Sequence, residues 1–295
     1  APEGAAGGKC IAIRADIDAL PMPEESGEEF ACPTGKEAHT CGHDFHAAML
    51  LTAAKMLKEK EDTLEGTIKF MFQPAEETFE GSKNMIENGI LENPPVDAAL
   101  AYHVSPGKMP IGLFMYNDKD TMMYSVDGFK ITIHGKGSHG AYPHVGVDPI
   151  NIGVHIHLAL QELIAREISA KKEAALTIGK FQAGSASNVI PETAVIEGTL
   201  RTFEPEIREQ LIARITEMAE ALAKAYRVKM ELTVLSDVPP VKDDPAMDKE
   251  AVASIQELDD TTKVLPLYHV MGSEDFAFFS EKVPSSYFCI GAGVE

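Results

Sequence analysis

Residues 39–46 read HTCGHDFH and place three histidines, one cysteine and one aspartate within eight positions. Thiolate and imidazole groups are ligands suited to zinc and to other late divalent ions. Cys41 and His43 lie two residues apart, and Gly42 lets the backbone bend so that both side chains can point at one ion. The same residues also fit a buried free cysteine beside surface histidines and a helix-capping Asp44. A metal site therefore needs further ligands from elsewhere in the chain.

Glu76, Glu77 and His103 are candidates for those ligands. The two glutamates follow TIKFMFQP (67–74), which predicts a strand, and His103 ends DAALAYHV (97–104), which predicts the next strand. Adjacent carboxylates repel, so the pair suits a crevice in which a cation neutralises one and the other serves as a base. The alternative is an acidic pair that compensates the dipole of a helix start. Three segments near the ends of successive predicted strands thus supply Cys41 with His43, Glu76 with Glu77, and His103. This combination favours a metal site.

Helices alternate with these strands. CIAIRA (10–15) predicts the first strand, 45–61 predicts a helix that Asp44 caps, and 82–89 predicts a second helix. This alternation is typical of a parallel sheet with crossover helices. In such sheets ligands gather beyond the carboxyl ends of the strands, where Asp18 also lies.

From Tyr124 the pattern changes to strand, helix, strand, strand, helix, strand. The predicted elements are 126–135, 148–167, 174–182, 193–202, 205–226 and 228–235. This order is typical of the split βαβ pattern of ferredoxin-like domains. The Pro-rich, acidic stretch 236–245 then predicts a return to the first domain, where 273–283 predicts a helix and 286–293 a buried strand.

We therefore expect an α/β fold, in which a catalytic domain with a mostly parallel sheet is interrupted by an inserted ferredoxin-like α+β (βαββαβ) domain. A chain of 295 residues is long for one core and suits two domains. The expected bounds are 1–121 for the first catalytic segment, 122–236 for the inserted domain and 237–295 for the second catalytic segment.

The composition is that of a water-soluble globular protein, and its apolar runs are too short to span a bilayer. The formal net charge of -20 repels nucleic acid and anionic lipid, so we expect small molecules or a second copy as partners. The cysteines lack disulfide-type spacing, which favours the cytoplasm. The chain opens with APEGAAGG just before a core strand, and we expect upstream residues to be missing.

Eight short motifs run in order along nearly the whole chain: RADIDALP (14–21), HTCGHDFH (39–46), FQPAEE (72–77), YHV (102–104), SHGAYPH (138–144), SNVIP (187–191), GTLR (198–201) and GSEDFA (272–277). Together they resemble the signature of the N-acyl-amino-acid amidohydrolases. This group of metallohydrolases includes hippurate hydrolases, N-acetyl-diaminopimelate deacetylases and plant auxin-conjugate hydrolases. It is related to aminoacylase and to glutamate carboxypeptidases.

The resemblance implies two divalent metal ions per subunit, manganese or zinc first and cobalt or nickel as alternatives. Their implied ligands are Cys41, His43, Glu77 and His103. Glu76 resembles the general base that takes a proton from a metal-activated water and delivers it to the leaving amine. Asp18 falls where relatives keep a carboxylate that orients a metal ligand, and its alternative is a turn aspartate before Pro21.

In the inserted domain, His139 resembles the histidine that relatives bring to the active site, often from a partner subunit, to stabilise the oxyanion. Asn188 and Arg201 resemble substrate-binding residues, and a guanidinium suits a free carboxylate. A surface salt bridge is the alternative for Arg201. The resemblance thus implies that the inserted domain acts as a lid and forms a homodimer. The histidines expected to be structural are His134, His144, His155 and His157.

The implied reaction is hydrolysis of the amide bond of acetyl, benzoyl or similar N-acyl amino acids. The alternatives are a dipeptidase or carboxypeptidase on the same scaffold, and a catalytically impaired metal-binding relative. The Cys41 and His43 pair favours the amidohydrolase branch, and Glu76 favours an enzyme because a binder needs no base. One departure is that relatives supply a last metal-ligating histidine beyond the final strand, whereas this sequence ends at GAGVE (291–295). Either residues are missing or the second metal is poorly held.

Overall fold

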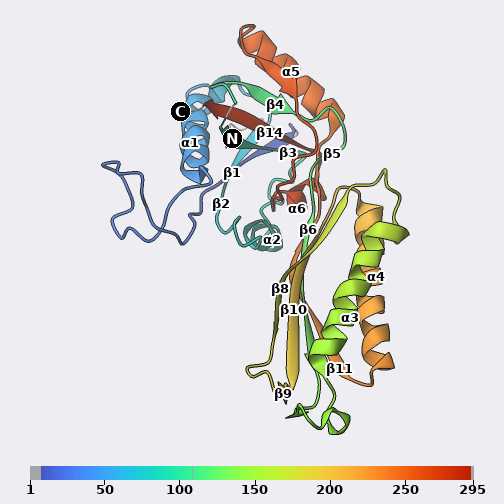
Figure 1. Cartoon of the computed structure of the whole chain (residues 1–295). Coiled ribbons are helices and arrows are strands. Elements are labelled where there is room, and N and C mark those ends of the chain that lie inside the picture. The colour runs from blue at the N-terminus through green and yellow to red at the C-terminus, as the bar shows by residue number, and fades with distance from the viewer. Residues whose placement is uncertain (1–7, 108, 294–295) are drawn as a thin grey trace. The chain divides into compact units, whose positions relative to one another are not determined.

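The computed structural model describes residues 8–107 and 109–293 (Figure 1). The chain divides into two compact units. One comprises Ala1–Met123 with Val241–Glu295, and the other comprises Tyr124–Pro240. Among the described residues, no helix combines the length and the apolar composition needed to cross a membrane.

A six-stranded sheet organises the first unit, in the order β13-β4-β14-β3-β1-β2. Its strands are β1 (Cys10–Asp16), β2 (Thr67–Gln73), β3 (Ala98–Pro106), β4 (Phe114–Tyr116), β13 (Val264–Pro266) and β14 (Ser285–Gly293). Only β4 and β14 pair antiparallel among these neighbours, so the sheet is mixed. Because β1, β2 and β3 are parallel, their carboxyl ends share one edge of the sheet.

Four helices and a short two-stranded ladder complete the first unit. They are α1 (His43–Lys58), α2 (Gly81–Glu87), α5 (Pro245–Leu258), α6 (Ala277–Ser280) and the antiparallel pair β5 (Thr121–Met123) with β12 (Val241–Lys242). A 3₁₀ turn at Glu61–Thr63 follows α1. The helix predicted over 273–283 was too long, because only the four residues of α6 are α-helical.

The start of α1 differs from the prediction. Gly42 occupies the N-cap position with φ 86°, and no side chain caps the helix, so the prediction that Asp44 is the cap was wrong. A Cβ at Gly42 would lie 2.5 Å from a methyl carbon of Val104. Glycine is therefore required here both by the left-handed backbone and by the close approach of β3. Asp44 instead lies in the first turn, where its charge favours the helix dipole.

The second unit is a four-stranded antiparallel sheet in the order β11-β6-β10-β8. Its strands are β6 (Val126–His134), β8 (Ala174–Ala183), β10 (Thr193–Thr202) and β11 (Lys229–Val238). The helices α3 (Pro149–Glu162) and α4 (Pro205–Ala225) cover one face of this sheet (Figure 1). A minor ladder joins β7 (Ser138–His139) to β9 (Val189–Ile190), and short helical turns occupy Pro143–Val145 and Leu163–Glu167.

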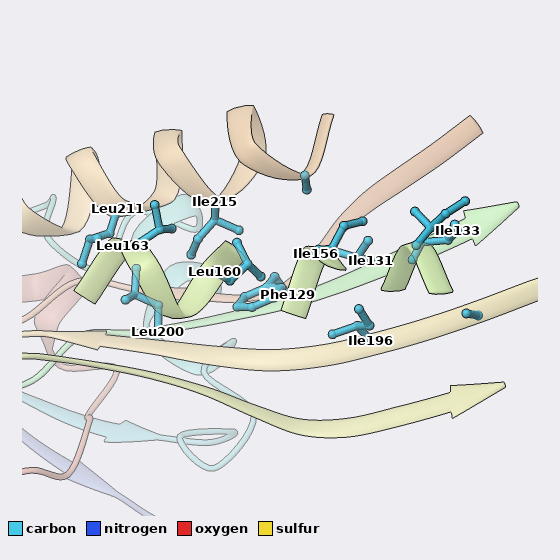
Figure 2. Packing of buried hydrophobic residues seen from close by; sticks show 13 residues of the cluster. Phe129, Ile131, Ile133, Ile156, Leu160, Leu163, Ile196, Leu200, Leu211 and Ile215 are labelled. Atoms are coloured by element: carbon cyan, nitrogen blue, oxygen red, sulfur yellow. The ribbon is translucent and has the colours of Figure 1, made fainter. Parts of the chain in front are cut away.

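The core of the second unit follows from the two periodicities of its elements. Phe129, Ile131 and Ile133 alternate along β6 and point to one face, as residues two apart in a strand must (Figure 2). Leu160 on α3 and Leu211 on α4 are fully buried against them. The apolar stripes of both helices thereby meet the apolar face of the sheet.

Two carboxyl groups are buried where the chain enters α5. Asp248 is 1% exposed and Asp243 is 5% exposed. The Oδ1 atom of Asp243 accepts a hydrogen bond of 2.9 Å from the backbone N–H of Tyr287. Burial raises the pKa of Asp248 to about 7. Burial and the charge of Asp248 together raise the pKa of Asp243 well above its usual range.

This burial predicts a pH dependence of stability. A carboxyl whose pKa is raised in the folded state releases its proton on unfolding, so its contribution to stability falls as pH rises from about 4 to about 7. Asp248→Asn lacks this titrating carboxyl. As the pH rises through this window, we therefore expect its free energy of unfolding to increase relative to that of the parent, by at most about 1.4 kcal/mol per pH unit. Urea unfolding followed by circular dichroism measures the difference. The exposed Asp260→Asn variant should track the parent, and parallel behaviour of both variants would contradict the assignment.

Candidate metal centre

The carboxyl ends of β1, β2 and β3 bring the predicted ligands together around the start of α1. The Sγ atom of Cys41 lies 3.4 Å from Nε2 of His103. Nε2 of His43 lies 4.0 Å from a carboxylate oxygen of Glu76 and 4.0 Å from one of Glu77. These five side chains come from three separate segments of the sequence, and His43 lies at their centre.

The arrangement fits a divalent cation. Cys41, His43 and His103 form one group whose ligand atoms all lie within 4.8 Å of one another, and His43, Glu76 and Glu77 form a second. The His43 side chain is 1% exposed, and its Nε2 atom has no hydrogen-bond partner among the described residues. A buried, unpaired nitrogen beside a thiol and carboxylates is costly unless it binds something. Sulfur, nitrogen and oxygen donors of this kind suit zinc or manganese.

His43 is oriented by Asp18. The Nδ1 atom of His43 lies 3.0 Å from the backbone oxygen of Asp18 and 3.3 Å from its carboxylate. The other carboxylate oxygen accepts a hydrogen bond of 3.0 Å from the backbone N–H of Glu77. Burial alone lowers the pKa of His43, but Asp18, Cys41 and Asp16 raise it to about 11. The surroundings of this imidazole therefore favour a cation.

Glu76 lies in a strained turn. The preceding Ala75 adopts φ 57°, which costs a residue with a Cβ about 1 kcal/mol or more. The turn buries the Glu76 side chain, which is 8% exposed. Burial, and then the charge of Glu274, raise the pKa of Glu76 to about 10, against the opposing effect of Arg14. Burial and the neighbouring carboxylates thus make Glu76 a stronger proton acceptor than an exposed glutamate, which suits a general base.

Behind the predicted ligands lies a buried ionic cluster that the motifs contain but to which no role was assigned from sequence. The Arg14 side chain is fully buried on β1 and donates hydrogen bonds to Asp16 at 2.8 Å, Glu274 at 2.7 Å, Asp275 at 3.1 Å and Gln73 at 2.9 Å. Besides the motifs themselves, the sequence signal for this cluster was a charged residue inside the apolar run CIAIRA. One guanidinium thus faces three carboxylates.

The residues predicted in the inserted domain fall into two places within the second unit. His139 pairs with Val189, and the backbone N–H of Gly140 donates to the oxygen of Asn188 at 2.7 Å. His139 and Asn188 are therefore neighbours, and both are exposed.

Arg201 lies on β10 of the four-stranded sheet, at the end of that strand far from His139. Strand β10 begins at Thr193, opposite His134, and reaches Arg201 opposite Ala175. At ~3.3 Å per residue this separates Arg201 from the His139 end by roughly 26 Å along the strand.

The histidines predicted to be structural also lie in the second unit. The imidazole of His155 stacks on Tyr226 with ring centroids 5.5 Å apart, and His134 faces Glu231 at 3.5 Å. His144 lies edge-on to Tyr142. His157 is half-buried on α3. None of these four histidines belongs to the ligand groups found in the described part of the chain, which lie in the first unit.

Known proteins resemble the chain over nearly all of its residues. The model of peptidase family M20/M25/M40 matches residues 12–295. N-acetyl-L-cysteine deacetylase of Bacillus subtilis (strain 168) is 39% identical over 293 residues, which are 98% of this chain and 68% of that protein. Thermostable carboxypeptidase 2 of Saccharolobus solfataricus is 35% identical over 287 residues, 96% of this chain and 71% of that protein.

A solved structure is also similar. The crystal structure of the Bacillus subtilis YXEP protein, a dinuclear metal binding peptidase from the M20 family, has a TM-score of 0.79. Its sequence is 34% identical, and the match covers 96% of this chain and 72% of that one.

The ionic cluster predicts a large loss of stability when its single cation is removed. Arg14→Met leaves the carboxylates of Asp16, Glu274 and Asp275 buried without their partner, which should cost about 3–5 kcal/mol. The matched control is Arg214→Met, because Arg214 also pairs with two glutamates, but at the surface. Urea unfolding in the presence of a chelator compares the two. A loss no larger for Arg14→Met than for the control would contradict the stabilising role of Arg14.

Proposed function

The chain belongs to peptidase family M20/M25/M40, and on that premise we propose that it is a metal-dependent amidohydrolase that cleaves the amide bond of N-acyl amino acids. One observation carries the proposal. Buried candidate ligands from three segments converge on the unpaired Nε2 atom of His43, and a carboxylate with raised pKa lies beside them. The deacetylase relative supports an acyl amino acid as the substrate class.

We propose that Cys41, His43, Glu77 and His103 hold two divalent metal ions, as the dinuclear relative supports. The thiol of Cys41 favours zinc, while the carboxylate and the histidines also suit manganese, cobalt or nickel. When bound, such ions lower the pKa of water and polarise a carbonyl oxygen.

In this proposal Glu76 is the residue that transfers the proton. Its buried carboxylate accepts a proton from the attacking water and delivers it to the nitrogen of the leaving amino acid. Asp18 acts as a positioning residue, because its contacts with Nδ1 of His43 and with the backbone of Glu77 fix two ligands at once.

We further propose that the second unit is a ferredoxin-like lid and dimerisation domain. In chain order its strands lie 4-1-3-2 in the sheet, with the helices on one face. His139 would stabilise the oxyanion, and Asn188 and Arg201 would bind the substrate. Because Arg201 lies roughly 26 Å along β10 from the end of the strand near His139, a small substrate cannot touch both in one copy. In a homodimer, Arg201 and His139 can reach one substrate from different subunits.

An exposed apolar surface on the second unit supports the homodimer. Ile150, Val154 and Leu158 lie one turn apart along α3 and are 38%, 42% and 60% exposed. Phe181, on the edge strand β8, packs beside this helix, since a Cβ at Gly153 would lie 2.7 Å from its ring. Burial of such a stripe against its copy is the usual role of an apolar patch beside a free sheet edge.

The same scaffold supports a second candidate function, a carboxypeptidase or dipeptidase, because of the 35% identity to a carboxypeptidase. The chemistry of Glu76 and the metal ligands is common to both. We propose a cytoplasmic location, which the four free cysteines support.

Replacement of the proposed base tests the mechanism. Glu76→Gln should keep the metal content of the parent while turnover falls about 100- to 10,000-fold. Metal is measured by elemental analysis, and turnover by amine release from N-acetyl and N-benzoyl amino acids and from dipeptides. The exposed Glu80→Gln, four residues away, is the control and should retain the parent rate.

The outcomes separate the candidates. Parental turnover in Glu76→Gln would remove Glu76 from the mechanism. Preference of the parent for dipeptides would favour the second candidate, and metal without turnover on any substrate would indicate an impaired relative.

The dimer is tested by a charge on the apolar stripe. Leu158→Glu should convert the homodimer to a monomer, because a buried, unpaired carboxylate is costly. Size-exclusion chromatography with light scattering gives the mass. Leu235→Glu is the control, because Leu235 is 55% exposed on β11 at the opposite edge of the sheet. A dimeric Leu158→Glu protein would show that another surface forms the interface.

A further inference from the structure

His46, the third histidine of HTCGHDFH, has no role in the function proposed above. It lies one helical turn after His43 on α1 and is fully buried. Its ring lies 5.4 Å from the His43 ring and 4.7 Å from the His103 ring, centroid to centroid. Asp16, His43 and His46 also form one of the compact groups that could bind a metal. From spacing and burial alone, His46 is as good a ligand as His43.

Its hydrogen bonds show otherwise. The backbone N–H of Val104 donates to Nε2 of His46 at 2.9 Å, so this nitrogen carries a lone pair and no proton. The proton of the neutral ring must then be on Nδ1, which donates to the carboxylate of Asp16. Asp16 in turn accepts from Arg14 at 2.8 Å. Both ring nitrogens of His46 are thus occupied, and neither is available to an ion.

The group that His46 does hold is the peptide between His103 and Val104. The N–H of this peptide, on Val104, donates a hydrogen bond to Nε2 of His46. In the next peptide, the carbonyl oxygen of Val104 accepts a hydrogen bond of 2.6 Å from Nδ1 of His103. The Nε2 lone pair of His103 is thereby directed toward Cys41, 3.4 Å away. A further hydrogen bond connects β3 to α1, because the hydroxyl of Tyr102 donates to the backbone oxygen of His46 at 2.9 Å.

We propose that His46 is a positioning residue rather than a ligand, and that the chain Arg14–Asp16–His46 fixes the 103–104 peptide so that His103 faces the metal centre. The inference rests on the proposed metal centre and adds to it a residue that acts only through His103. Partners that orient a ligand in this way commonly change metal affinity about 10- to 100-fold when removed.

Three substitutions separate the two hydrogen bonds of His46. Alanine removes both. Glutamine places its carbonyl oxygen near the position of Nε2 and can still accept from Val104, whereas asparagine reaches only as far as Nδ1 and can still donate to Asp16. Since the Val104 bond positions His103, we expect His46→Gln to lose the least affinity. His46→Asn and His46→Ala should bind zinc about 10- to 100-fold more weakly than the parent, measured by competition with a chromogenic chelator.

The matched controls are Cys41→Ala and His155→Ala. Cys41→Ala removes a proposed ligand and should lose at least as much zinc affinity as His46→Ala. His155→Ala removes an exposed histidine of the second unit and should bind as the parent does. If His46→Ala does not fold, the inference is tested by comparing the zinc affinities of His46→Gln and His46→Asn. Equal affinity in these two variants would then overturn the inference.

Nuclear magnetic resonance of the parent gives a readout that a merely structural role would not share. With ¹¹³Cd bound and the histidines labelled with ¹⁵N, we expect coupling of cadmium to nitrogens of His43 and His103 and none to His46. The His46 ring should show the Nδ1–H form. In the His46→Asn variant the cadmium resonance should shift, because His103 is no longer held. A cadmium coupling to His46, or an unshifted resonance in the variant, would overturn the inference.

Failure of this inference is distinguishable from failure of the proposed function. A parent that binds neither zinc nor cadmium would overturn the metal centre and this inference with it. A parent that binds metal, with equal affinity in His46→Ala, would overturn the positioning role alone.

Discussion

The candidate site depends on the burial of Arg14 among carboxylates. A charge can leave water only where partners replace its hydration, and the Arg14 side chain is fully buried. Its partners Asp16 and Gln73 belong to β1 and β2, while Glu274 and Asp275 come from a segment 260 positions away in the sequence. Correct folding of the first unit therefore requires that the two sequence segments of this unit meet at this guanidinium. The strand ends that carry the candidate ligands are fixed as a consequence.

The cluster also sets the electrostatic character of the site. Arg14 neutralises only part of the negative charge of Asp16, Glu274 and Asp275, and Glu76 adds another carboxylate close by. This excess of negative charge raises the pKa of two groups. The pKa of His43 is raised to about 11 and that of Glu76 to about 10. Protons and metal ions compete for the same lone pairs, so the excess of negative charge that raises both pKa values also favours the binding of divalent cations.

Sequence reasoning found those parts of the fold that depend on neighbouring residues. The period-two pattern of β6 and the long amphipathic pattern of α4 are local, and both elements formed where expected. The start of α1 was missed because Gly42 is selected by contact with Val104, a residue of another strand. Helix α5 was missed because the acidic, proline-containing start at Asp244 and Pro245 resembled a linker. In the structure Asp244 caps the helix and Pro245 begins it.

The same limit explains what could be predicted of the site. Residue type and position at strand ends were enough to gather Cys41, His43 and His103, because parallel strands bring their carboxyl ends together whatever their sequence. They could not separate His43 from His46, which share a helix face, a chemistry and complete burial. What separates them is one backbone N–H on β3, donated by Val104 to His46 and to no atom of His43. The choice between ligand and support is thus made by the register of a strand far away in sequence, which local patterns do not encode.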